Sequence, residues 1–239
     1  MSDDLLKLPR IYVEQDLSEG TPLLLNPDQA HYFRSVLRRQ VGDEFRIFNG
    51  RDGEWLARLD ALGKKEALAK PIEQIKAQPP APNALHLVFA PPKKQRLSLL
   101  IEKAVELGAT HLHPVLTAHT ENRHLNTERI KAQTIEAAEQ CERMHIPALY
   151  EVEDMKTVVK NWSGPAPLFA CIERHEAPGI DTLRPGEHSF LIGSEGGFND
   201  EEIGFLLKEK GVKAISLGET VYRAETACII CLVKANAFV

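Results

Sequence analysis

The chain has 239 residues, of which 43% are hydrophobic and 26% charged, and its formal net charge is -5. This is an ordinary globular balance, long enough for one large or two modest domains. The mild acidity lowers the expectation of a general nucleic-acid binder, because such proteins usually carry a basic surplus. The acidic start MSDDLLKLPR does not predict a signal peptide, and no run approaches the roughly 20 apolar residues of a membrane helix. We therefore expect a cytoplasmic protein without a membrane partner.

The first part of the chain, residues 1–76, predicts a small β-barrel with one helix. Short strands are expected at 10–13, 22–25, 45–48, 55–59 and 67–75. Asn-Gly and Asp-Gly pairs between the third and fourth of these are typical of a hairpin. Asn26-Pro27-Asp28 predicts the start of a helix, with Pro27 suited to its first position. The body of that helix, over 31–40, places Arg34 and Arg38 on one face, with Arg39 alongside. From the residues alone, a solvated helix face is the simpler interpretation of these arginines.

A proline-rich linker over 77–83 separates this part from a second domain over 84–239. Its sequence, AQPPAPN, disfavours a helix or central strand and stiffens the connection. Strands and helices then alternate. Strands are expected at 85–90, 111–116, 148–152, 167–172, 190–192 and 214–217, and helices at 93–107, 126–144 and 155–162. The pattern predicts the α/β class, with a mostly parallel sheet covered by helices on both faces.

Two strands near the C-terminus stop on glycine, at Gly193 and Gly218, and each is followed by a turn and a helix. Open α/β sheets bind ligands beyond the carboxyl ends of their strands. Asn199 and Glu202 suit a capping box, and the acidic pair 200–201 crowds the helix start where a phosphate would normally bind. We therefore expect a ligand that is neutral or positive near the first turn. A plain tight connection explains that turn, taken alone, equally well.

Metal and redox chemistry are not favoured by the cysteines and histidines. Cys228 and Cys231 lie inside the apolar stretch ACIICLV, which indicates two buried helix residues rather than a zinc or redox pair. His111 and His113 alternate along a predicted strand but lack further convergent ligands, so no metal site is predicted. The motifs G-x-x-x-x-G-K-[ST] and G-x-G-x-x-G are also absent from the sequence. This argues against a nucleotide hydrolase and an ordinary dinucleotide dehydrogenase.

The segments LIGSEGGFNDEEI and LGETVYRAETA resemble the paired cofactor loops of the SPOUT-class RNA methyltransferases. The chain is similar nearly throughout to the bacterial family that methylates N3 of a uridine in small-subunit (16S) ribosomal RNA. Supporting stretches are RIYV, HYFRSVLRRQVGDEFRIFNG, KKQRLSLLIEKAVELGATHLHPV and EAAEQCERMHIP. The resemblance implies an N-terminal PUA-like RNA-binding β-barrel and a C-terminal domain with a trefoil knot. It also implies S-adenosylmethionine as cofactor, and a homodimer that acts on ribosomal RNA.

The same resemblance implies site residues in both loops. Cofactor contacts are expected from Ile192, Gly193, Ser194, Glu195, Gly196, Gly197, Leu217, Gly218, Val221, Tyr222 and Arg223. The family commonly has proline at the position of Ser194, and Ile-Leu where Val221-Tyr222 stands. Arg223 is the expected catalytic residue, because a guanidinium can donate two hydrogen bonds to a uracil oxygen or a phosphate. Glu195 is expected to orient the loop or contact the substrate. A salt bridge from Arg223 to Glu219 or Glu225 is the alternative, and no residue stands out as a general base.

RNA affinity should come largely from phosphate contacts on one basic face. The expected contacts are Arg10, Arg34, Arg38 and Arg39 on the barrel, and Lys93, Lys94, Arg96, Arg123 and Arg143 on the second domain. Other functions stay open on the sequence: methylation of a different RNA site, a non-catalytic RNA-binding protein on the same scaffold, or a small-molecule α/β enzyme of another kind.

Overall fold

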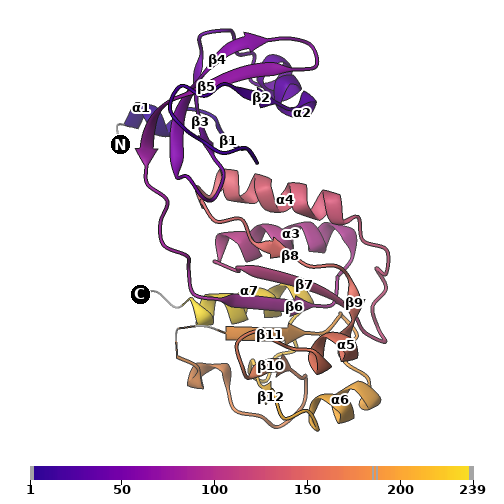
Figure 1. Ribbon diagram of the computed structural model, residues 1–239. Coiled ribbons are helices and arrows are strands. Elements are labelled where there is room, and N and C mark those ends of the chain that lie inside the picture. The colour runs from indigo at the N-terminus through magenta and orange to yellow at the C-terminus, as the bar shows by residue number, and fades with distance from the viewer. Residues whose placement is uncertain (1–2, 185, 187, 237–239) are drawn as a thin grey trace. The chain divides into compact units, whose positions relative to one another are not determined.

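The structure, a computed structural model, describes residues 3–184, 186 and 188–236. The chain divides into two compact units (Figure 1). The first comprises Met1–Ala81 and Glu139–His145, and the second comprises Pro82–Ala138 and Ile146–Val239. Among the described residues, no helix combines the length and the apolar character needed to cross a membrane.

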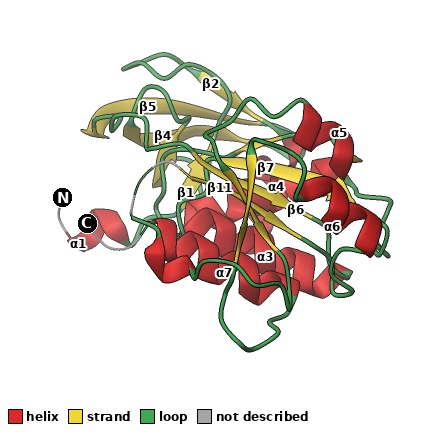
Figure 2. Cartoon of the chain, turned by 90° about the horizontal axis from the view of Figure 1, so that it is seen from below, coloured by secondary structure: helices red, strands yellow, loops and turns green. Residues whose placement is uncertain are grey.

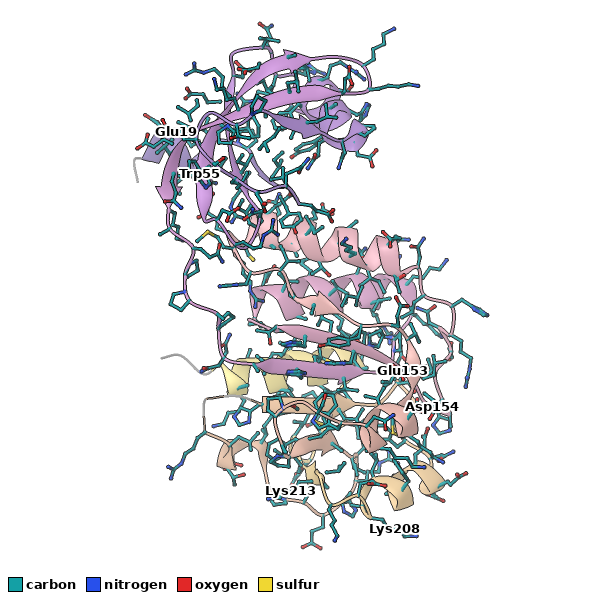
Figure 3. All side chains as sticks on the ribbon, viewed as in Figure 1. Glu19, Trp55, Glu153, Asp154, Lys208 and Lys213 are labelled. Atoms are coloured by element: carbon teal, nitrogen blue, oxygen red, sulfur yellow. The ribbon has the colours of Figure 1, made fainter. Side chains whose placement is uncertain are left out.

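The first unit is built on a five-stranded sheet with the order β1-β3-β4-β5-β2. β1 runs parallel to β3, and the other pairs are antiparallel. Phe33, Phe45 and Ile47 are fully buried in its core. The predicted hairpin joins β3 to β4, where the indole of Trp55 donates to a carbonyl in the turn (Figure 3). The strands are β1 (Arg10–Tyr12), β2 (Leu23–Leu25), β3 (Glu44–Phe48), β4 (Glu54–Leu62) and β5 (Ala67–Lys76).

The helix of this unit begins at the predicted start, with Asn26 as its cap and Pro27 in its first turn, but it ends before residue 40. α2 covers Pro27–His31, begins with an Asn26 capping box and continues as a π-helical turn over Tyr32–Val36. Arg38 lies beyond it with a φ of 54°, in the left-handed region. The prediction that Arg34 and Arg38 share one helix face is therefore wrong. A short helix, α1 (Asp3–Leu6), was not predicted.

Residues 139–145 comprise the last two residues of α4 (Thr127–Gln140) and the segment after it, and they cluster with the first unit. The side chain of Glu139 accepts a hydrogen bond from the backbone N–H of Tyr12 at 2.7 Å. Arg46 forms an ion pair with Glu142 at 2.8 Å. The domain predicted as one continuous stretch therefore contains a segment that belongs with the first unit, and the helix expected to run to residue 144 ends earlier.

The second unit is an α/β fold on a parallel sheet with the order β12-β10-β11-β6-β7-β8, and β9 also pairs with β7. The predicted parallel sheet is confirmed. Its strands are β6 (Leu85–Phe89), β7 (His111–Leu116), β8 (Ala148–Leu149), β9 (Glu153–Asp154), β10 (Leu168–Cys171), β11 (His188–Ile192) and β12 (Val212–Ile215).

Helices cover both faces of this sheet, as predicted (Figures 1 and 2). Leu87 and Phe89 of β6 face a core shared with α3 (Lys94–Glu106) and α7 (Ala224–Ala235). The intervening Val88 faces the opposite core, shared with α5 (Met155–Lys160) and α6 (Asp200–Leu206). Asp154 caps α5 through the N–H groups of its first turn (Figure 3). A short 3-10 helix occupies Ile180–Thr182.

The carboxyl ends of three neighbouring strands lie level at one edge of the sheet. Cys171 at the end of β10 is in register with Ile192 of β11 and Ile215 of β12. Because parallel strands bring their carboxyl ends to the same edge, the three turns that follow meet there.

Candidate functional site

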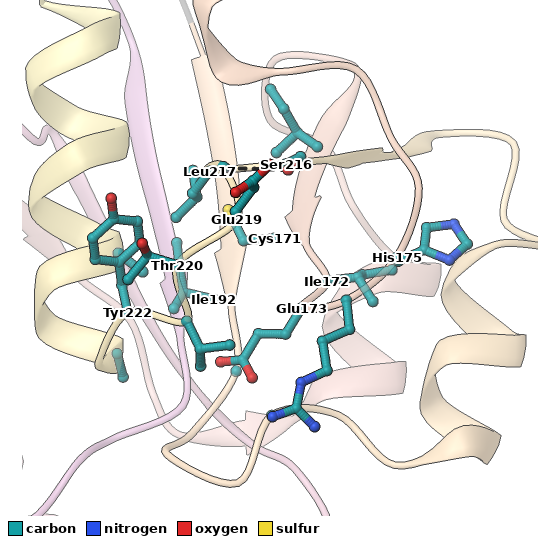
Figure 4. A pocket seen from close by; sticks show the side chains of 18 of the residues that line it. Cys171, Ile172, Glu173, His175, Ile192, Ser216, Leu217, Glu219, Thr220 and Tyr222 are labelled. Atoms are coloured by element: carbon teal, nitrogen blue, oxygen red, sulfur yellow. Dashed lines mark hydrogen bonds between the residues drawn. The ribbon is translucent and has the colours of Figure 1, made fainter.

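The turns after β10, β11 and β12 enclose a cavity of about 150 Å³ (Figure 4). The predicted cofactor residues that line it are Ile192, Gly193, Ser194, Gly197, Leu217, Gly218, Val221 and Tyr222. Ala224 and Ala227, from the first turns of α7, also line it. The two glycine loops therefore converge on one pocket, although they lie more than twenty residues apart in the sequence.

The first of these loops is a tight turn. The Gly197 N–H donates to the Ser194 carbonyl at 2.9 Å, and Gly197 has a φ of +66°, which favours glycine. A side chain at Gly193 would meet the Gly197 backbone at 3.2 Å. Ser194 is only 4% exposed, and its hydroxyl has no hydrogen-bond partner among the described residues. The cavity wall thus presents one unsatisfied buried polar atom.

The loop after β10 supplies the part of the cavity that the sequence analysis missed, residues 171–175. Figure 4 shows Glu173 extending toward the middle of the pocket, while His175 lies near its edge. Burial raises the pKa of Glu173, and the neighbouring Arg174 partly opposes the rise. The strand order is what identifies this loop as part of the site. Because β10 lies between β11 and β12, its loop must lie between theirs.

Three predicted site residues lie outside the cavity wall, namely Glu195, Gly196 and Arg223. Arg223 occupies the N-cap position of α7 and is exposed, between the lining residues Tyr222 and Ala224. It therefore lies at the rim. Within the described part of the chain its side chain has no salt bridge to Glu219 or Glu225.

Glu195 is held by the start of α3. Its Oε1 lies 3.4 Å from Nη1 of Arg96 and 3.5 Å from the backbone nitrogen of Lys93. Nε of Arg96 also lies 3.7 Å from Oε1 of Glu225, whose Oε2 is buried without a partner among the described residues. The guanidinium of Arg96 therefore contacts the carboxylates of both Glu195 and Glu225, and these contacts link the first glycine loop to α7.

Beside the cavity, the same turn borders a second, open hollow of about 440 Å³. Glu195 and Gly196 line this hollow, whereas Ser194 and Gly197 line the cavity. Its other walls come from the loop between β7 and α4: Ala118, His119, Thr120, Glu121 and Arg123. The predicted RNA contact Arg123 therefore lies next to the glycine turn.

The prediction that Arg10 lies on an RNA-contacting surface is wrong. Its side chain is 3% exposed, its Nε lies 2.9 Å from Oε1 of Glu54, and its guanidinium stacks over the Phe48 ring at 3.6 Å. A side chain so enclosed belongs to the interior of the first unit rather than to an RNA-contacting surface. Arg143 is partly exposed, and burial lowers its pKa to about 10.

The other predicted RNA contacts have varied surroundings. Arg34 donates to two backbone carbonyls, those of Gly63 and Lys64. Arg38 is exposed, and Arg39 lies 3.9 Å from Asp43. Lys94 lines a groove of about 220 Å³ between α3 and α4. Lys93 pairs with Glu121 at 3.1 Å.

The cysteine prediction is confirmed. Cys228 and Cys231 are buried in α7, and burial raises the pKa of both thiols well above the ordinary value, which disfavours the reactive thiolate. His111 and His113 stack with His86 on neighbouring strands. Over residues 3–184, 186 and 188–236, no three His, Cys, Asp or Glu side chains gather as metal ligands.

Comparisons with known proteins agree with this arrangement. The RNA methyltransferase domain model matches residues 79–236, and the RNA methyltransferase PUA domain model matches residues 25–72. The chain is 34% identical to ribosomal RNA small subunit methyltransferase E of Rickettsia conorii, covering 97% of this chain and 96% of that protein. The Synechocystis protein of the same name is 32% identical, covering 95% and 76%.

Solved structures give the same result. A methyltransferase of Legionella pneumophila, determined with bound SAM, superposes with a TM-score of 0.87 at 27% identity and covers 97% of this chain and 98% of that one. The ribosomal RNA small subunit methyltransferase E of Neisseria gonorrhoeae, bound to S-adenosyl methionine, gives 0.83 at 25% identity and 95% coverage of both chains. By sequence along nearly its whole length and by fold, this protein belongs to the ribosomal RNA small subunit methyltransferase E family of RNA methyltransferases.

Proposed function

We propose that this protein transfers a methyl group from S-adenosylmethionine to N3 of a uridine in small-subunit ribosomal RNA. The observation that carries the proposal is the convergence of both glycine loops on one cavity at the carboxyl edge of the parallel sheet. Membership of an RNA methyltransferase family supports the reaction class, and the sequence resemblance supports the uridine N3 atom.

The cavity suits this cofactor chemically. Its wall combines apolar side chains such as Ile192 and Leu217 with the carboxylates of Glu173 and Glu219 and the unpartnered hydroxyl of Ser194. Apolar surface suits an adenine ring, and carboxylates suit the positive charges of a sulfonium and an ammonium group. S-adenosylmethionine, when bound, supplies an electrophilic methyl group. The residues expected to hold it are those of the two glycine loops together with residues 171–175.

Arg223 and Glu195 contribute to the substrate side of the reaction. N3 of uridine carries a proton between two carbonyl groups, and the base becomes anionic when that proton leaves. Arg223 at the cavity rim stabilises this charge by donating to a uracil oxygen or holds the adjacent phosphate. Glu195, fixed by Arg96, keeps the loop in place. The homodimer and trefoil knot implied by the resemblance are part of this proposal.

The decisive experiment is transfer of a labelled methyl group to ribosomal RNA from a strain that lacks this protein, followed by identification of the modified nucleoside. We expect 3-methyluridine in the small-subunit RNA. If a different methylated nucleoside were found, uridine N3 would not be the target of this protein. Binding of RNA without any transfer would favour a non-catalytic RNA-binding protein.

Arg223→Ala tests the site within that assay. We expect turnover to fall by about 100-fold or more, as when a single charge-stabilising donor is removed, while the affinity for S-adenosylmethionine changes little. Arg184→Ala, which removes an exposed arginine outside the cavity wall, is the matched control and should keep full turnover. Full turnover in Arg223→Ala would remove Arg223 from the mechanism.

A further inference from the structure

His119 lies beside the glycine turn with a defined tautomer. Its Nδ1 is 2.9 Å from the carbonyl oxygen of Gly196. A carbonyl can only accept a hydrogen bond, so Nδ1 must carry the proton. In the neutral ring Nε2 is then an unprotonated acceptor. Within the described part of the chain, Nε2 has no hydrogen-bond partner.

The loop around His119 is held on both sides. The Ala118 N–H donates to Oε1 of the buried Glu202 at 2.7 Å. The Thr117 N–H and hydroxyl both bond the Thr120 hydroxyl, at 2.8 and 2.9 Å, and both threonines are buried. The imidazole is therefore presented by a fixed backbone, which is what catalytic positioning requires.

Gly196 is fitted to this histidine. A side chain at Gly196 would lie 3.0 Å from Cβ and 3.2 Å from Nδ1 of His119, tighter than ordinary contacts. The absence of a side chain at this position thus allows the turn and the histidine to meet. Through this contact, one turn borders both the cofactor cavity and the hollow that contains His119.

The charged groups around His119 indicate which of them can act as a base. Glu121 and Arg123 come from its own loop, Glu195 from the turn, Glu202 from α6, and Lys93 and Arg96 from the start of α3. Glu195 is paired with Arg96, Glu121 with Lys93, and Glu202 accepts two backbone hydrogen bonds. His119 differs from these carboxylates because its Nε2 is a neutral base without a hydrogen-bond partner among the described residues, whereas each carboxylate already has a cationic or backbone partner.

We propose that the hollow beside the turn receives the target uracil and that His119 is the general base of the reaction. This inference rests on the proposed function. The N3–H bond breaks and its proton goes to Nε2, while the N3 electron pair forms the new N–CH₃ bond. The pair of the broken S–CH₃ bond stays on sulfur, and the imidazolium later returns its proton to water. Arg123 in the same hollow stabilises the anionic base.

His119→Asn separates this role from a structural one. The asparagine side-chain amide can still donate to the Gly196 carbonyl from the position of Nδ1, but it has no basic nitrogen. We expect turnover on ribosomal RNA to fall by about 100- to 10,000-fold, the range for losing a general base. Affinities for S-adenosylmethionine and for RNA should be retained. The rate–pH profile should lose the inflection of the wild-type protein and rise steadily with hydroxide concentration.

Two further variants complete the test. His119→Ala should regain turnover when imidazole is added, whereas a purely structural role would not be rescued in this way. Glu195→Gln should keep the wild-type inflection. If His119→Asn keeps both turnover and inflection, or if Glu195→Gln loses the inflection instead, the assignment of His119 is overturned while the proposed function stands. Absence of 3-methyluridine with the wild-type protein would overturn both.

Discussion

The carboxylate of Glu202 joins two loops that lie far apart in the sequence. Oε2 accepts from the Asn199 N–H at 3.0 Å and completes the capping box of α6, while Oε1 accepts from the Ala118 N–H at 2.7 Å. The side chain is 5% exposed, so neither bond is replaced easily by water. The helix that follows the cofactor turn is thereby tied to the loop that carries His119.

Glu202→Gln should destabilise the protein, because the amide presents N–H groups where two acceptors are needed. A buried N–H left without an acceptor costs about 1–3 kcal/mol, measurable by urea unfolding. Turnover should fall as well, since Ala118 precedes His119. Glu201→Gln is the control on the same turn: Glu201 is exposed and pairs with Lys156, and its loss should leave the unfolding curve unchanged. Equal effects of the two variants would contradict this role for Glu202.

Gly196→Ala should separate cofactor binding from catalysis. The added methyl group meets His119 at 3.0 Å, so the histidine must move or lose its hydrogen bond to the turn. We expect a drop in turnover of about 10-fold or more, in line with the cost of small misplacements in active sites, with a much smaller change in S-adenosylmethionine affinity. Gly204→Ala on α6, where no atom lies within 4 Å, should leave turnover unchanged and slightly stabilise the helix. Unchanged turnover in Gly196→Ala would argue against the fit between this glycine and His119.

Local features of the sequence predict local structure well in this protein. The strand expected at 111–116 is found with those bounds, and the capping box of Asn199 and Glu202 forms as its spacing indicates. Both follow from neighbouring residues alone. Features that depend on strand order could not be predicted in this way. The loop after β10 lines the cavity because β10 lies between β11 and β12, and no local pattern encodes that order.

The surroundings of Arg10 and Arg38 in the first unit also could not be predicted from neighbouring residues alone. Arg10 and Glu54 are 44 residues apart and meet because β3 pairs with both β1 and β4. Read along the sequence, Arg10 is a basic residue at the start of a strand and resembles a surface contact. Only the pairing of the strands reveals a buried ion pair, and only the left-handed backbone at Arg38 reveals that the helix has ended.

Arg10→Ala should therefore weaken the fold rather than the surface interaction with RNA. It leaves the buried carboxylate of Glu54 with one partner fewer, and breaking a buried pair costs about 3–5 kcal/mol. In the folded protein, the dependence of RNA affinity on salt should be unchanged. Arg38→Ala is the counterpart at an exposed position: stability should be kept, and the salt slope should fall by about 1 if Arg38 contacts a phosphate. If the salt dependence of RNA affinity were reduced in Arg10→Ala, Arg10 would be an RNA contact after all.

The histidine stack of the second unit should make stability fall on mild acidification. Burial, with a smaller effect of neighbouring histidines, lowers the pKa of His86 to about 4 and of His113 to about 3. In the unfolded chain histidine titrates near 6.5. Below that pH the unfolded chain binds protons that the folded chain does not, so stability falls as the pH drops from about 6.5 toward 4, by about 1.4 kcal/mol per pH unit for each histidine.

Urea unfolding across this pH window tests the prediction. His113→Gln removes one titration and can keep the hydrogen bond between His113 and His86, while His86 and His111, whose pKa burial also lowers, remain. The slope should therefore fall by about 1.4 kcal/mol per pH unit and not vanish. His124→Gln changes an exposed histidine and should leave the slope as it is. An unchanged slope in His113→Gln would show that this histidine is not the source of the acid sensitivity.

Ser194 and Ser189 should respond in opposite ways to the loss of their hydroxyl groups. Ser194 lines the cavity and its buried hydroxyl has no partner among the described residues, whereas the hydroxyl of Ser189 in β11 donates to the Pro165 carbonyl at 2.8 Å. In Ser194→Ala the unliganded protein loses an unsatisfied buried group, so its free energy of unfolding should stay the same or rise. The affinity for S-adenosylmethionine should fall by about 5- to 10-fold, the value of one net hydrogen bond. Ser189→Ala should instead lower stability by about 1 kcal/mol and keep the affinity.

Calorimetric titration of S-adenosylmethionine and urea unfolding, each applied to both variants, measure these affinities and stabilities. An undiminished affinity in Ser194→Ala would mean that the cofactor leaves this hydroxyl unpaired.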